Sequence, residues 1–125
     1  ALITGLASNR SIAWGIAKAL HREGARLAFS YAGEVFKRRV EPLAEQVGSD
    51  FVEECDVSRE VDLEHIFGQV AERLGNIDIL VHSIGFANRD ELSGPYYNTS
   101  REGFRLALDI SCYSFVTMVR HAMPS

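Results

Sequence analysis

Short apolar runs alternate with amphipathic segments along almost the whole chain, and this alternation most constrains the fold. Four segments, wholly or partly apolar, are typical of strands, at residues 1–4, 26–31, 50–55 and 77–82. Apolar residues recur at helical spacing between these runs and after the last one. Strands joined by helical crossovers are parallel, and the helices cover both faces of their sheet. The sequence therefore predicts an α/β fold with a doubly wound parallel sheet and three α/β/α layers.

The helical segments also carry start signals and apolar faces. We expect Ser58 to cap the third helix, residues 99–102 (TSRE) to form a capping box for the last, and Pro42 to cause a kink or a late start in the second. A polar loop is expected over residues 88–98. The apolar faces are Ile12, Ile16, Ala19 and Leu20 in the first helix, Phe36, Val40, Leu43 and Val47 in the second, Leu63, Ile66, Phe67, Val70 and Leu74 in the third, and Phe104, Leu108, Ser111, Phe115 and Met118 in a long, buried last helix.

Composition limits the class of protein. A chain of 125 residues with 46% hydrophobic and 24% charged residues suits one globular domain. The net charge of -4 offers no general attraction to nucleic acid or to an anionic membrane. Cys55 and Cys112 form no CxxC pattern, which favours reduced thiols and the cytoplasm. We also expect no membrane span, and the apolar start and helical end indicate part of a longer chain.

Ligands of doubly wound sheets bind beyond the carboxyl ends of the strands. Gly5 follows the first strand and permits a tight turn, while Ser11 and Ile12 begin a helix whose free N–H groups suit a phosphate. Gly15 would let that helix pack closely against the strand. This loop by itself fits a nucleotide site and an ordinary strand-to-helix turn equally well.

The other three strand ends carry compatible chemistry. Asp56 could accept a hydrogen bond from an adenine amino group or cap the following helix. Residues 83–85 could bring small side chains and exposed backbone to a ligand, or form an ordinary turn. Glu34 follows the second strand slightly late for a ribose contact, and a cap or a solvated charge explains it better. Ala32 and Gly33 offer no cation to a 2′-phosphate, which favours NADH over NADPH, although Lys37 and Arg38 follow one turn later.

Other kinds of site lack support in the sequence. The four histidines show no metal-ligand spacing, and no GxSxG elbow is present around Ser83. We therefore predict no metal site and no hydrolase nucleophile.

Six segments together resemble the bacterial enoyl-(acyl-carrier-protein) reductases. They are residues 4–5 (TG), 11–15 (SIAWG), 55–57 (CDV), 81–87 (VHSIGFA), 101–104 (REGF) and 109–115 (DISCYSF). These reductases are NADH-dependent enzymes of type II fatty acid synthesis and divergent members of the short-chain dehydrogenase/reductase superfamily. The resemblance implies a Rossmann-type fold, of which residues 1–125 form the N-terminal part of a single domain.

The resemblance also implies site residues. Those implied for NADH are Gly5, Ser11 and Ile12 at the pyrophosphate, Ala32 near the adenosine ribose where the family often has Gln, Asp56 and Val57 at adenine, and Ser83, Ile84 and Gly85 at the ribose and nicotinamide. Phe86 and Ala87 would face the acyl substrate, which is carried by acyl-carrier protein. The family's catalytic Tyr and Lys lie beyond residue 125, so no catalytic residue is assigned here and Tyr113 is no substitute. A cytoplasmic homotetramer is implied as well.

Two other functions stay open at this point. A ketoacyl or alcohol reductase of the same superfamily would share the fold, although such enzymes usually have Asn-Ala-Gly where this chain has Ser83–Gly85. A non-catalytic dinucleotide-binding module would bind cofactor without turnover. If the 125 residues were the whole molecule, we would expect no catalysis.

Overall fold

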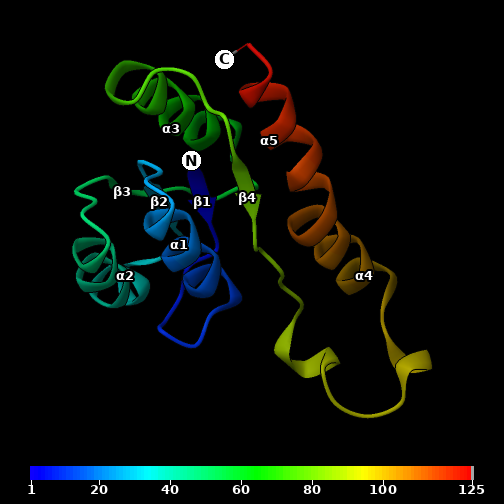
Figure 1. Ribbon diagram of the computed structural model, residues 1–125. Helices are drawn as coiled ribbons and strands as arrows, with labels where there is room; N and C mark the ends of the chain where they lie inside the picture. The colour runs from blue at the N-terminus through cyan, green and yellow to red at the C-terminus, as the bar shows by residue number, and fades with distance from the viewer. Residues whose placement is uncertain (125) are drawn as a thin grey trace.

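The computed structural model describes residues 1–124, and four parallel strands lie at its centre (Figure 1). The strands are β1 (Leu2–Thr4), β2 (Ala28–Tyr31), β3 (Val52–Glu54) and β4 (Leu80–His82), in the spatial order β3-β2-β1-β4. Ile3 pairs with Phe29 of β2 on one side and with Val81 of β4 on the other. The predicted parallel sheet is confirmed, and its order reverses between β1 and β4.

Helices cover both faces of the sheet, as predicted. The helices are α1 (Ile12–Arg22), α2 (Glu34–Gln46), α3 (Glu60–Arg73), α4 (Arg101–Leu108) and α5 (Ser114–Ala122), with a π-helix, η3 (Asp109–Tyr113), joining the last two. Alternate residues of the short strands face opposite sides: Ile3 and Phe29 pack with α1 and α2, whereas Leu2 and Ala28 pack with α3 and α5. The predicted α/β/α layers are therefore confirmed.

The segment from α4 to α5 forms one long rod beside the sheet (Figure 1). Its α5 end contacts α3 and β4, whereas its α4 end extends away from the strands. Met118 on α5 is fully buried, but Phe104, Leu108 and Phe115 remain 48–49% exposed. The expectation of a helix buried along its whole length is therefore wrong, because the sheet covers only the α5 half.

The buried face of α1 differs from the predicted one. Ala13, Trp14 and Ala17 are buried, whereas Ile12 is 82% exposed and the other three predicted positions are half-buried. Small alanines let α1 approach the sheet closely, and Trp14 fills the space beside them. Gly15 is exposed, and a Cβ added there would meet no atom within 4 Å, so its predicted role in close packing is also wrong.

The faces of α2 and α3 are confirmed. Val40, Leu43 and Val47 are buried, as is most of the predicted α3 face. The helix α2 begins at Glu34 directly after Gly33, so a late start caused by Pro42 is wrong, while a kink there stays a prediction.

Two predicted caps move by one residue. The N-cap of α3 is Arg59, and the hydroxyl of Ser58 instead donates to Asp56 Oδ1 at 2.6 Å. Ser100, not Thr99, caps α4 by accepting the Gly103 N–H at 2.9 Å.

The expected reciprocal carboxylate at α4 also has a different source. Glu91 accepts the N–H of Ser100 at 2.9 Å and its hydroxyl at 2.5 Å, which is the role that the sequence pattern gave to Glu102. Glu91 belongs to the 3-10 turn η1 (Arg89–Glu91), which with η2 (Tyr96–Asn98) lies within the predicted polar loop. The cap is therefore completed from outside the helix.

Candidate functional site

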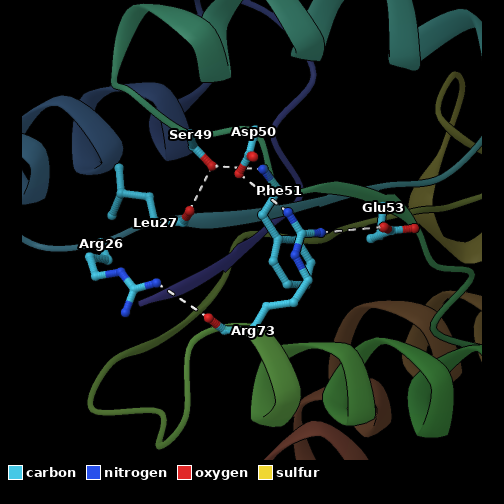
Figure 2. Close-up of polar contacts among 7 residues, drawn as sticks. All are labelled: Arg26, Leu27, Ser49, Asp50, Phe51, Glu53 and Arg73. Carbon is cyan, nitrogen blue, oxygen red and sulfur yellow. Dashed lines mark hydrogen bonds and ion pairs between the residues drawn. The ribbon is translucent and has the colours of Figure 1, made fainter.

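Two hollows lie at opposite ends of the sheet. The hollow at the amino ends of β2 and β3 has a volume of about 610 Å³. Figure 2 shows that its polar side chains are bound within the protein: Ser49 donates to the Leu27 backbone carbonyl at 2.6 Å, and Arg26 donates to the Arg73 backbone carbonyl at 3.2 Å.

Arg73 is the centre of this group. Its guanidinium lies 4.2 Å from the centre of the Phe51 ring and pairs with Asp50 at 3.2 Å and Glu53 at 3.8 Å (Figure 2). These contacts attach the end of α3 to β3 and to the two residues that precede it. We therefore interpret this end as structural.

The second hollow lies where doubly wound sheets bind their ligands, at the carboxyl ends of β1 and β4. Its volume is about 440 Å³. The residues that line it are Gly5, Leu6, Ala7, Ser30, Tyr31, Ala32, Phe36, Cys55, Asp56, Val57, Ser83, Ile84, Gly85, Phe86 and Ile110. It therefore brings together residues from all four strand ends, Phe36 from α2 and Ile110 from the π-helix.

Gly5 lies where the end of β1 comes close to the segment that follows β4. Its φ is +85°, a conformation that residues with a Cβ rarely adopt. A Cβ at this position would overlap the backbone carbonyl of Ser83. The Ser83 N–H donates to the Thr4 carbonyl at 3.3 Å, and the Thr4 hydroxyl donates to the Val81 carbonyl at 2.8 Å. The predicted tight turn is confirmed, and it depends on the absence of a side chain.

The loop between β1 and α1 is shaped by Ser11. Its Oγ accepts the N–H groups of Ala7 at 3.1 Å and Ser8 at 3.0 Å. Ser11 and Ile12 do not line the hollow, and Ile12 points largely to solvent. Their contact with a pyrophosphate stays a prediction, at the amino end of α1 where unpaired N–H groups favour anions.

At the end of β2, Ala32 lines the hollow and is exposed, whereas Glu34 begins α2 as an exposed residue outside it. Tyr31 precedes them and is buried. Burial raises the pKa of Tyr31, and the negative charge of Glu34 adds to the effect. The phenol is therefore neutral near pH 7 and can act as a hydrogen-bond donor.

At the end of β3, Asp56 uses one carboxylate oxygen to shape its own turn. Its Oδ1 accepts the N–H of Ser58 at 2.9 Å and the hydroxyl of the same residue. Within residues 1–124 the Oδ2 atom has no hydrogen-bond partner, so it can accept one from a ligand. The neighbouring Cys55 is buried, and burial raises the pKa of its thiol to about 12, so it is no nucleophile.

The segment after β4 forms the wall nearest the rod of helices. Ser83, Ile84 and Gly85 line the hollow together with Phe86, which is 50% exposed. Ala87 is half-buried and lies just outside it. Ile110 completes this wall from the π-helix.

Sequence reasoning missed several lining residues. Leu6, Tyr31 and Cys55 directly adjoin predicted positions, and Ala7 and Ser30 lie two residues from one, so the strand ends could have indicated them. No local signal could have indicated Ile110, because it is distant in the sequence. The described residues 1–124 contain no group of three His, Cys, Asp or Glu side chains placed to hold a metal ion. Among the same residues, no helix combines the length and apolar character needed to cross a membrane.

Comparison with known proteins agrees with this geometry. Residues 5–125 match the family model described as enoyl-(acyl carrier protein) reductase. The chain belongs to the enoyl-(acyl carrier protein) reductase family.

Individual relatives of this family are similar over nearly the whole chain. The enoyl-(acyl-carrier-protein) reductase (NADH) FabI of Escherichia coli is 51% identical over 120 residues, which cover 95% of this chain and 46% of that protein. The crystal structure of the reductase from Aquifex aeolicus is 49% identical, with a TM-score of 0.95 over 98% of this chain and 49% of that one.

A third relative was solved with a nucleotide. The reductase of Anaplasma phagocytophilum, in complex with NAD, is 42% identical with a TM-score of 0.93, over 98% of this chain and 47% of that one. The chain thus spans under half the length of the relatives it matches. The predicted family resemblance and the Rossmann-type fold are confirmed.

Proposed function

We propose that this chain supplies the NADH-binding part of an enoyl-(acyl carrier protein) reductase of type II fatty acid biosynthesis. The observation that carries the proposal is the hollow at the reversal between β1 and β4, lined by most of the residues implied for cofactor and substrate. The intact enzyme would transfer a hydride from NADH to the β-carbon of a trans-2-enoyl thioester. Cofactor preference follows the relatives named for NADH.

The residues of the hollow fit a dinucleotide. Gly5 lets the backbone turn without a side chain, and the free Oδ2 of Asp56 can accept the amino hydrogen of adenine beside Val57. Ala32 leaves room at the adenosine ribose and carries no charge to select a phosphate. Ser11 and Ile12 would meet the pyrophosphate from the amino end of α1.

The reacting end of the cofactor would lie along the segment after β4. Ser83, Ile84 and Gly85 would bind the ribose and nicotinamide, because their small or compact side chains leave the backbone accessible. NADH supplies the hydride when it is bound. Phe86 and Ala87 follow and would contact the acyl chain. No residue of this chain is assigned to proton transfer, and Tyr113 is half-exposed on the π-helix outside the hollow.

The proposal includes the partners and the compartment of the family. The substrate would be an enoyl group on acyl-carrier protein, and the enzyme would be a cytoplasmic homotetramer. Phe104, Leu108 and Phe115 support subunit contacts, because their half-exposed side chains give the outer α4–α5 rod an apolar surface.

The test is NADH oxidation by the intact protein that carries this chain. Crotonyl and acetoacetyl thioesters are compared as substrates under identical conditions. Reduction of the crotonyl thioester supports the proposal. A preference for the acetoacetyl thioester indicates a ketoacyl reductase, and NADH binding with no turnover of either substrate indicates a non-catalytic module.

The adenine contact has its own test. Asp56→Asn keeps an oxygen for the Ser58 turn but replaces the free acceptor by an N–H donor. We expect the Kd for NADH to rise by roughly 10- to 100-fold, in line with the loss of a hydrogen bond to a charged group. Asp90→Asn is the matched control, because Asp90 is exposed on η1 and does not line the hollow. Equal affinities in the two variants would rule out the Asp56 contact.

A further inference from the structure

The π-helix η3 interrupts the α4–α5 rod where the rod passes the hollow. Asp109–Tyr113 form this turn, and Ile110 within it lines the hollow. π-turns are rare, and they often accompany functional sites because they change the direction of the side chains that follow. Two hydroxyls reach the neighbouring strand from this turn and its margin: Ser111 contacts the segment that follows β4, and Ser114 contacts the last residue of β4.

Ser111 pairs with both polar backbone groups of Phe86. Its Oγ accepts the Phe86 N–H at 2.9 Å and donates to the Phe86 carbonyl at 3.1 Å. A Cβ added at Gly85 would lie 4.0 Å from the same Oγ, so the hydroxyl also lies near Gly85. One side chain thus satisfies a donor and an acceptor that lie 25 residues away in the sequence.

Ser114 fixes the turn to the end of β4. Its hydroxyl donates to the Ile110 carbonyl at 2.6 Å, so its oxygen is left to accept a hydrogen bond from His82 Nε2 at 2.7 Å. The His82 ring also meets the edge of Phe115 with ring centres 5.5 Å apart. These contacts hold η3 beside β4 and thereby place Ser111 opposite Phe86.

Beyond Ile84, which packs against the core beneath the sheet, the segment 84–87 has few contacts to hold it. Within the described part of the chain, residues 84–87 make no hydrogen bond other than the two to Ser111. Gly85 and Phe86 are exposed, so packing restrains them weakly. Ser111 is therefore the main restraint on the exposed residues Gly85 and Phe86.

We propose that Ser111 is a positioning residue that holds residues 84–87 in the conformation that receives the dinucleotide. This inference rests on the proposed function. Ser111 itself does not line the hollow, so it acts through Phe86 and its neighbours. Without it, the segment would have to be ordered when the cofactor binds, and this cost would weaken binding.

The experiment compares three variants of the intact protein with the wild type. Ser111→Ala removes the hydroxyl, Ser111→Thr retains it, and Cys112→Ala is the matched control one residue along the same turn, where the side chain is exposed. Amide hydrogen exchange of residues 84–87 is measured without ligand. The Kd for NADH, and the KM and kcat with a crotonyl thioester, are measured in parallel.

For Ser111→Ala we expect exchange of residues 84–87 and the Kd for NADH each to rise roughly 2- to 10-fold, the range for losing a neutral hydrogen bond. KM for NADH should rise more than kcat falls, Ser111→Thr should restore both readouts, and Cys112→Ala should match the wild type. Unchanged exchange, or faster exchange with unchanged Kd, would overturn the inference. A wild type that bound no NADH would refute the proposed function instead, while exchange would still decide whether Ser111 holds the segment.

Discussion

Replacing Gly5 by alanine tests the geometry on which the candidate site depends. Gly5 has a φ of +85°, and its missing Cβ would overlap the Ser83 carbonyl. The substitution therefore adds two separate costs: an unfavourable backbone conformation and a collision between the ends of β1 and β4. Gly75 allows the two to be separated, because its φ is +82° but a Cβ there would meet nothing within 4 Å.

The magnitudes follow from these two observations. A left-handed conformation costs a residue with a Cβ roughly 1–2 kcal/mol. Overpacking a close contact costs a further 1–3 kcal/mol, roughly, and a backbone carbonyl cannot rotate away as a side chain can. Gly5→Ala should therefore lower the free energy of unfolding by about 2–5 kcal/mol, and Gly75→Ala by about 1–2 kcal/mol. A typical domain has a total stability of only about 5–15 kcal/mol, so the first change is large.

The assay is urea unfolding of both variants of the intact protein, followed by fluorescence and by circular dichroism. We expect the midpoint to fall further for Gly5→Ala than for Gly75→Ala at an unchanged slope. Titration with NADH should also show a weaker Kd for the folded Gly5→Ala variant only. Equal destabilisation by the two substitutions would refute the reasoning, because it would mean that the Ser83 carbonyl does not restrict position 5.

Three further predictions concern the thiols, a cap and a half-buried imidazole. A maleimide should label exposed Cys112 in the folded protein, and it should reach buried Cys55, whose pKa is about 12, only after unfolding; mass spectrometry after peptide digestion would identify the modified residue. Ser100→Ala should lower the unfolding free energy by about 1 kcal/mol as an N-cap is lost. Thr99→Ala should cost less, and the reverse order in urea unfolding would contradict the assignment of the cap. Burial lowers the pKa of His82 below 6.5, so the folded state binds fewer protons than the unfolded state. The neutral ring therefore contributes stability that is fully present above pH 6.5. This stability should be lost as the pH falls through the folded pKa. His82→Gln should reduce this loss in unfolding measurements between pH 5 and 7.

Much of the fold could be predicted from the sequence, because alternating apolar runs and stripes report burial directly. The faces of α2 and α3 followed from single unambiguous stripes, such as the one through Val40 and Leu43. The buried face of α1 could not be predicted in the same way, since its apolar residues cover two faces. The face that packs on the sheet carries the small residues Ala13 and Ala17, and Ile12 is left exposed to solvent.

The candidate site also has parts that the sequence could predict and parts that it could not. Each strand end was visible in the sequence, so the pattern of strands and helices was enough to place Gly5, Asp56 and Ser83 at one edge of the sheet. The caps at Ser100 and Arg59 could not be placed to the residue, because neighbouring polar residues offer equivalent local signals and contacts such as the one from Glu91 decide between them.

The sequence alone determined the order of strands and helices, the parallel sheet and the edge at which a ligand would bind, because these depend on local periodicity and on general rules of chain connection. Only the tertiary structure decided which side chains complete that edge. Ile110 lines the hollow and Ser111 holds Phe86 because a turn distant in the sequence packs beside β4. Contacts of this kind depend on the three-dimensional path of the backbone, and no short stretch of residues encodes them.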